Sequence, residues 1–181
     1  MNLNRLQTLR KNKGFTIIEV GIVLALVGIA LYFVISKLSQ TADQNKAQNL
    51  STDLSSVIGN AKRLYASQTS YAGVTIGALR DNAVFPPQWN VAGTITGPFT
   101  GPISVAAGTL VAANDALAIT VPNIPSGVCS DIARMMVEGV NIITVAGTVV
   151  KPNNGAMDVA TLGTQCSSAA SVPMIFTFGR I

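Results

Sequence analysis

The amino-acid sequence predicts an α+β chain, in which one long N-terminal helix precedes a head with an antiparallel sheet. No proline occurs between Met1 and Phe85, so a helix in this region would not be broken by proline. Residues 15–35 form an almost unbroken apolar run, which favours a helix surrounded by apolar material. The remainder alternates short apolar runs with Gly, Pro, Asn and Thr, a pattern typical of strands and turns. We expect the helix to pack against the sheet.

The positive charge of the chain is confined to its first residues. The 181 residues carry a formal net charge of +4, and only 11% of them are charged. Residues 1–14 hold four basic side chains and no acid, whereas residues 15–181 hold equal numbers of basic and acidic side chains. No basic stripe is left after residue 14 to follow a phosphate backbone, so we expect no nucleic-acid binding.

The residue types needed for most enzyme sites are scarce. The chain has no histidine, which excludes Ser-His-Asp and Cys-His catalysis and any histidine-ligated metal. Acids are few and scattered, and no glycine-rich phosphate loop is present. Cys129 and Cys166 are far apart without a CxxC motif, so we expect neither a metal nor a cofactor. The two thiols are either free and buried or, outside the cytoplasm, joined in a disulfide.

The apolar run has the length and flanking charges of a membrane-spanning helix. As a helix, residues 15–35 would extend about 32 Å, enough to cross a bilayer core. Basic residues precede the run and Lys37 alone follows it, which predicts a cytoplasmic N-terminus. An ordinary cleaved signal peptide is disfavoured because its apolar region is usually only about 7–15 residues long. A plain signal anchor explains the length but gives no reason for Gly14 or Glu19.

The motif "KGFTIIEV", residues 13–20, explains both of these residues. It resembles the type III signal of type IV pilins and pseudopilins, in which a prepilin peptidase cuts after the glycine. The resemblance implies cleavage between Gly14 and Phe15, removal of the leader 1–14, and N-methylation of Phe15. It also implies that Glu19 pairs with the N-terminal amine of a neighbouring subunit and sets the register of assembly. An intramembrane acid usually has such a partner.

The helix is expected to continue beyond the membrane segment 15–36. Over residues 37–67 apolar side chains recur at three- and four-residue steps, which predicts an amphipathic helix packed on the head. These side chains are Ala47, Leu50, Leu54, Val57, Ile58, Ala61, Leu64 and Tyr65. Within the first half, Gly21, Ala25 and Gly28 lie on one helix face, where small residues permit close helix packing.

The head, residues 68–181, begins with a long loop that contains short helical or strand pieces, with Trp89 as its packing anchor. A hairpin is predicted from "GTLVAA" and "LAITV", which flank "NDA". A short helix over "SGVCSDIARMMVEG" follows, capped by Ser126 or Ser130, with Ile132, Met135, Met136 and Val137 near its buried side. "NIITVAGTVV" supplies one or two strands and "MIFTFGR" the last one.

The pilin resemblance implies more than the fold. It implies a Cys129–Cys166 disulfide that bounds the region 129–166, as in type IVb pilins, although Phe15 is unusual for that group. The implied function is the major structural subunit of a type IV pilus, used for adhesion, aggregation or conjugative contact. A minor pilin or a type II secretion pseudopilin is the alternative.

The implied partners are prepilin peptidase, the assembly platform with its ATPase, the membrane and other copies of the chain. The implied location is the inner membrane with a periplasmic head, and then the extracellular pilus.

Overall fold

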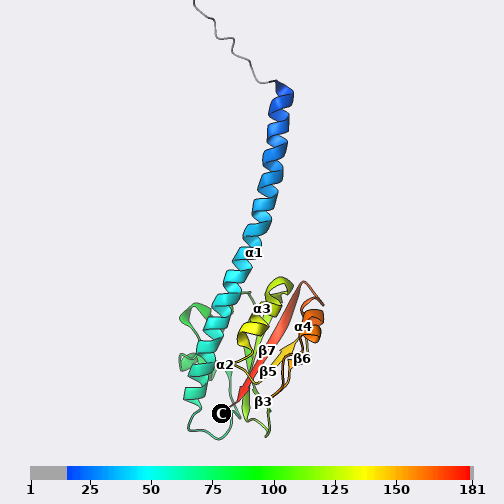
Figure 1. The fold of residues 1–181 in the computed structure, drawn as a ribbon. Coiled ribbons are helices and arrows are strands. Elements are labelled where there is room, and N and C mark those ends of the chain that lie inside the picture. The colour runs from blue at the N-terminus through cyan, green and yellow to red at the C-terminus, as the bar shows by residue number, and fades with distance from the viewer. Residues whose placement is uncertain (1–15, 180–181) are drawn as a thin grey trace, which may run out of the picture. The chain divides into compact units, whose positions relative to one another are not determined.

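The computed structural model describes residues 16–179, and the side chains of residues 36–40 are not described. The chain forms two units, residues 1–39 and residues 40–181. The first unit contains the N-terminal part of helix α1 (Ile17–Leu64), and the second contains the rest of α1 and the head (Figure 1). The other elements are α2 (Ile76–Asp81), the 3-10 helix η1 (Pro87–Trp89), β1 (Asn90–Val91), β2 (Thr94–Ile95), β3 (Ser104–Gly108), β4 (Ala116–Pro125), α3 (Ser126–Met136), β5 (Ile142–Val145), β6 (Thr148–Lys151), α4 (Val159–Cys166) and β7 (Ser171–Gly179).

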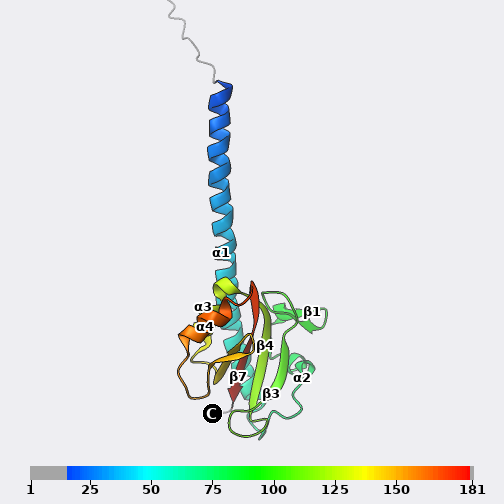
Figure 2. The ribbon, with the colours of Figure 1, turned by 90° about the vertical axis from the view of Figure 1, so that its right-hand side faces the viewer.

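A five-stranded antiparallel sheet in the order β3-β4-β7-β5-β6 organises the head (Figure 2). The last strand, β7, lies in the middle, where Phe176 is opposite both Ile119 of β4 and Ile143 of β5. Alternate residues along a strand point to opposite faces of the sheet. One face is therefore lined by fully buried side chains: Leu117, Ile119, Val121, Ile143, Val145, Met174, Phe176 and Phe178.

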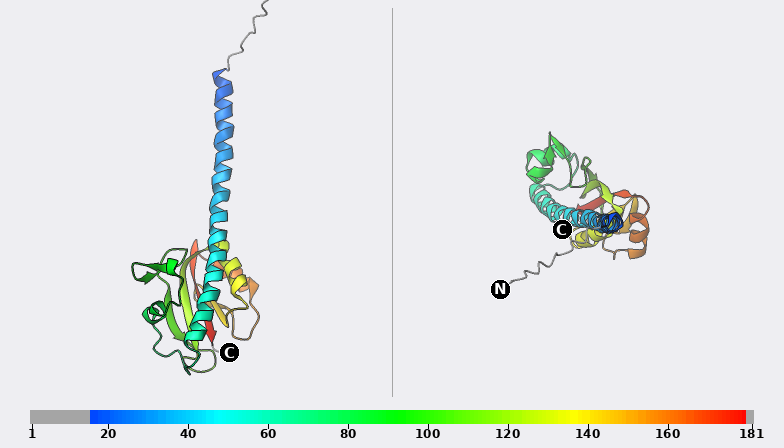
Figure 3. Two further views of the ribbon diagram at one scale, coloured as in Figure 1. Left: turned by 90° about the vertical axis from the view of Figure 1, so that its left-hand side faces the viewer. Right: turned by 90° about the horizontal axis from the view of Figure 1, so that it is seen from above.

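The part of α1 after residue 40 crosses this apolar face beside α3 (Figures 1 and 3). The predicted apolar stripe of the helix is confirmed, because Leu50, Leu54 and Val57 have no exposed surface. Each such aliphatic side chain contributes about 1.5–3 kcal/mol by leaving water. The Ser51 hydroxyl of α1 donates a hydrogen bond to the Met136 sulfur of α3 over 3.4 Å. These contacts make α1 part of the head's core.

Residues 65–103 form an irregular loop with short elements, as the sequence indicates. Trp89 is 2% exposed, and its ring lies 6.2 Å from that of Phe85, so it is a packing anchor. The small hairpin β1–β2 turns through Ala92 and Gly93, with φ of 49° and 84°. Two positive φ angles are the requirement of the type I′ turn.

The same four residues, Val-Ala-Gly-Thr, recur in the turn between β5 and β6. Val145 pairs with Thr148, and Ala146 and Gly147 have φ of 48° and 83°. Alanine carries a steric cost in this left-handed region, which Gly avoids and Asn tolerates. The repeated tetrapeptide therefore builds two similar hairpins, each with one strained alanine.

Several sequence predictions need correction. The strand predicted over "GTLVAA" is wrong, because β3 ends at Gly108 and the Asp115 carboxylate holds the next residues in a loop. Neither Ser126 nor Ser130 caps α3, because Pro125 is the N-cap residue and no side chain caps it. Helix α1 ends at Leu64 rather than near Ser67, with a turn after it.

The helix predicted over "SGVCSDIARMMVEG" is confirmed as α3. One residue that was predicted to lie near its buried side is exposed instead. Ile132 and Met136 are buried, whereas Met135 is 42% exposed and lines an open groove together with Gln44 and Gln48 of α1. The strands β5, β6 and β7 are where the sequence places them, and β7 begins three residues earlier than "MIFTFGR". Helix α4 was not predicted.

Candidate assembly site

The first unit offers an apolar helical surface that nothing in the described structure covers. Residues Ile17–Ile35 have a mean hydropathy of 2.6, and none of this span is buried. Its large apolar side chains are between 45% and 90% exposed. The span is about 28 Å long as a helix, close to the ~30 Å of a bilayer core. A soluble protein does not leave so large an apolar surface exposed to water, so this segment requires lipid or other apolar helices around it.

Glu19 lies in the first turn of α1, at the beginning of this apolar surface. Its backbone N–H donates a hydrogen bond to the Thr16 hydroxyl over 3.3 Å, and no ion pair involves its carboxylate among the described residues. A carboxylate near a helix N-terminus interacts favourably with the helix dipole. Gly14 and Phe15, between which cleavage is expected, lie outside the described residues.

Gly21, Ala25 and Gly28 form a face of small residues on the same helix. They follow an i, i+4, i+7 spacing, so they lie on one side. Apart from the neighbouring backbone of the helix itself, no described atom lies within 4 Å of where a Cβ on Gly21 or Gly28 would stand. A partner helix therefore has room to approach the backbone closely along this face.

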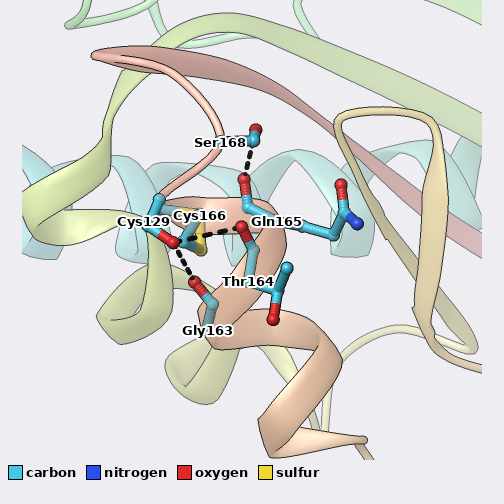
Figure 4. The surroundings of a disulfide bond; sticks show 7 residues. Cys129, Gly163, Thr164, Gln165, Cys166 and Ser168 are labelled. Atoms are coloured by element: carbon cyan, nitrogen blue, oxygen red, sulfur yellow. Dashed lines mark hydrogen bonds between the residues drawn. A yellow bond between two sulfur atoms is a disulfide. The ribbon is translucent and has the colours of Figure 1, made fainter.

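A disulfide joins helices α3 and α4 of the head. Cys129 of α3 and Cys166 at the end of α4 are joined, their Cα atoms are 5.6 Å apart, and both are buried (Figure 4). The Ser167 hydroxyl donates to the carbonyls of Gly163 and Thr164, at 2.8 and 3.1 Å. These bonds satisfy carbonyls that a helix end leaves unpaired. The predicted pair is confirmed, and it ties α4 to α3 beside the sheet.

Two aspartates that sequence reasoning did not assign hold the loops of the head. Asp115 accepts hydrogen bonds from the N–H groups of Leu110, Val111 and Ala112, at 2.7, 2.8 and 2.8 Å. These bonds lower the pKa of the Asp115 carboxyl, with the bonds from Ala112 and Leu110 as the main causes. A carboxylate that accepts several N–H bonds is stabilised in its charged form.

Asp158 plays a similar part at the start of α4. Its carboxylate accepts from the Thr161 hydroxyl at 2.6 Å and from the N–H groups of Ala160 and Thr161. The Thr161 side chain is the main cause of its lowered pKa. The signal was present in the sequence, since an Asp before an apolar segment is typical of an N-cap. Within the described ranges, no group of three or more His, Cys, Asp or Glu side chains gathers as a metal site.

Comparison with known proteins decides the family. The family model described as "PilS N terminal" matches residues 44–178, which is most of the chain. The chain belongs to the PilS N-terminal family. The family model matches the second half of α1 and the head, whereas the pilin resemblance noted in the sequence rests on the N-terminal motif, residues 13–20. This is a family of pilin structural subunits and not of enzymes.

Relatives and solved structures agree with this family. The major structural subunits of the bundle-forming pilus of Escherichia coli O127:H6 and of Escherichia coli O111:H- are each 29% identical over 105 residues, 57% of this chain. That alignment covers 54% of each relative, so the chain spans about half the length of the curated relatives that it matches.

The solved structures support the pilin fold. TcpA, a type IV pilin from Vibrio cholerae El Tor biotype, aligns with a TM-score of 0.59 at 16% identity, over 74% of this chain and 98% of TcpA. A type IVb pilin from Salmonella typhi aligns with a TM-score of 0.53 at 15% identity, over 73% of this chain and 99% of that pilin. The α+β pilin fold that the sequence predicts is confirmed.

Proposed function

We propose that this PilS-family chain is the major structural subunit of a type IV pilus. The observation that supports this most is the pairing, in one chain, of an uncovered apolar helix with a disulfide-bonded pilin head. The span Ile17–Ile35 is stable in a membrane before assembly and against the same segment of other copies afterwards. The relatives named as major pilus subunits favour the same role.

The proposed maturation begins at the inner membrane, with the head in the periplasm. Prepilin peptidase cuts between Gly14 and Phe15 on the cytoplasmic side, and Phe15 receives the N-methyl group. The cut removes the four basic residues of the leader and leaves the apolar helix attached to the head. An oxidising periplasm suits the Cys129–Cys166 disulfide.

Glu19 then directs the next subunit into place. Its carboxylate pairs with the new amine at Phe15 of a neighbouring chain, because a charge in an apolar core is costly without a partner. The face of Gly21, Ala25 and Gly28 lets the packed helices approach. The assembly platform and its ATPase extract the subunit from the membrane, and the filament serves adhesion, aggregation or conjugative contact outside the cell.

Two Glu19 variants and one control variant test the assembly role. Glu19→Ala should be processed normally but should enter filaments poorly, and Glu19→Gln should behave similarly because it also lacks the charge. Asp53→Asn removes one negative charge from the second half of α1 and should assemble normally. Sheared filaments and membranes are compared by immunoblotting. Normal filament yield from Glu19→Ala would contradict the register role.

Electron microscopy of cells that lack the chain tests the major-subunit role. Pili should be absent, and expression of the chain should restore them. Abundant normal pili without the chain would instead favour a minor pilin or a secretion pseudopilin.

A further inference from the structure

The turn between β6 and α4 contains the only Asn-Gly step in the sequence (Figure 1). The Gly155 N–H donates to the Pro152 carbonyl over 3.1 Å, and this hydrogen bond closes a β-turn over residues 152–155. Asn154 is the third residue of the turn, and its φ of 56° lies in the left-handed region, which Gly adopts freely and Asn tolerates. The turn therefore favours an asparagine at position 154.

Position 155 of this turn is restricted to glycine by packing. A Cβ atom on Gly155 would stand 2.5 Å from the Pro152 Cγ atom, far closer than the usual contact distance between two carbons. The proline ring is rigid and cannot turn aside as a flexible side chain would. Because Gly155 has no Cβ, its backbone nitrogen is also open to approach from the side chain that precedes it. The local structure thus places an unhindered backbone nitrogen directly after an asparagine amide.

Two other exposed asparagines have the same backbone conformation but a different neighbour. Asn114 and Asn123 have φ of 61° and 57°, and both are exposed, as Asn154 is. Asp115 follows the first and Ile124 follows the second, so each next nitrogen is shielded by a side chain. Among the described residues, no hydrogen bond holds the side-chain amide of Asn154. The three sites therefore differ mainly in access to the next backbone nitrogen.

We propose that Asn154 is a site of spontaneous deamidation. The Gly155 nitrogen attacks the Asn154 Cγ atom, a C–N bond forms, and the side-chain NH2 group leaves as ammonia with the proton of the attacking N–H. The product is a five-membered succinimide, which takes up one water molecule at one of its two carbonyls. Addition at Cγ gives aspartate, and addition at the backbone carbonyl gives isoaspartate. In both cases the nitrogen regains a proton and one new carboxylate is formed.

The hydrogen bond of the turn controls the rate of this reaction. The Gly155 N–H must leave the Pro152 carbonyl before its nitrogen can attack, so the folded chain reacts more slowly than an unstructured one. Pro152 and Asn154 are exposed, and an exposed turn opens locally without unfolding of the core. The site therefore reacts slowly in the native head, and the extent of reaction records the age of the molecule.

The reaction changes the charge of the mature chain, if the chain matures and forms filaments as proposed above. Residues 15–181 carry equal numbers of basic and acidic side chains, so each conversion makes a neutral chain negative. The new carboxylate lies in the same surface hollow as Asp115, which is already negative. Neutral surfaces associate readily, whereas surfaces with the same net charge repel each other. A filament outside the cell therefore gains negative charge as it ages.

Peptide mapping by mass spectrometry of the detergent-solubilised full chain tests the site. After incubation at growth temperature and mildly alkaline pH, Asn154 should be converted to aspartate and isoaspartate, relative to a sample that was not incubated. Asn114 and Asn123 should keep their amides. The rate should rise with pH, because the attacking nitrogen must lose its proton. An intact Asn154 amide after incubation, or equal conversion at all three asparagines, would overturn the proposal.

A matched pair of variants tests the assignment with an independent readout. Asn154→Gly removes the amide and keeps the turn, because Gly adopts a positive φ freely. Isoaspartyl methyltransferase, which methylates isoaspartate, should label the aged wild-type chain and Asn123→Gly equally. Labelling of Asn154→Gly should be lost. Labelling of Asn154→Gly at the wild-type level would overturn the proposal.

Electrophoretic mobility of sheared filaments tests the consequence and separates it from the proposed function. At low ionic strength, wild-type filaments from old cultures should move faster toward the anode than those from young cultures, and Asn154→Gly filaments should show no change with age. The same change in both would overturn the charge consequence. Conversion of Asn154 in the solubilised chain, without filaments in cells, would support the site and refute the pilus role. Filaments whose Asn154 amide stays intact at every age would refute the site alone.

Discussion

Removing the Cys129–Cys166 disulfide should cost the head a large part of its stability. The bond closes a loop with a sequence separation of 37 residues. On the chain-entropy model, a loop of this length contributes about 4 kcal/mol by restricting the unfolded chain. Domains of this size are stable by only about 5–15 kcal/mol, so the double variant Cys129→Ala, Cys166→Ala should be close to unfolding.

The chain carries its own probe for this measurement. Trp89 is its single tryptophan and is 2% exposed, so its fluorescence reports unfolding of the head. Urea titration of the detergent-solubilised full chain should show the free energy of unfolding reduced by about 4 kcal/mol in the double variant. Ser168→Ala is the control for local fraying, because it removes only the 2.7 Å bond to the Gln165 carbonyl and should cost about 0.5–1.5 kcal/mol.

A loss below about 1 kcal/mol in the double variant would refute the reasoning, because the loop-closure contribution would then be absent. The same fall in both the double variant and Ser168→Ala would show that the end of α4, rather than the cross-link, determines the stability of this region.

Three further changes have outcomes that the structure specifies. Ala92→Asn should raise the free energy of unfolding by about 0.5–1 kcal/mol, because Asn tolerates a positive φ, whereas Ala169→Asn should have no comparable effect. Leu54→Ala should lower the free energy of unfolding by about 2–5 kcal/mol, because Leu54 is fully buried. Ser56 is exposed, so Ser56→Ala should lower it by less than about 0.5 kcal/mol. Urea titration measures both changes. Asp115 should protect its three bonded loop amides from hydrogen exchange above pH ~4, and the protection should be lost as pH falls through its lowered pKa. Asp115→Asn should show weak protection at every pH, and unchanged protection would contradict the role of the carboxylate.

The long helix could be predicted from the sequence because its signals are local. The absence of proline, the apolar run and the later three- and four-residue spacing all depend on residues close in the chain. The Cys129–Cys166 pair required the pilin resemblance, since spacing alone leaves free thiols open. Strand order could not be predicted, because the central position of β7 depends on pairings between residues far apart, such as Phe176 with Ile119 and Ile143.

Two of the failed predictions have a common cause. "GTLVAA" has the composition of a strand, but a single carboxylate, Asp115, satisfies three of its amides and keeps it in a loop. Pro125 begins α3 directly from β4, and the Ser126 N–H donates to the Ala170 carbonyl before β7, which leaves no role for a serine cap. In both places a tertiary or side-chain bond replaces the local preference, and composition does not reveal it.

Mass spectrometry of filaments sheared from cells tests the central claim most directly. The account predicts an abundant chain that begins at Phe15, with one methyl group on the Phe15 nitrogen and with Cys129 joined to Cys166. A chain that retains residues 1–14, a chain cut beyond the apolar helix, or filaments that lack this chain would contradict it.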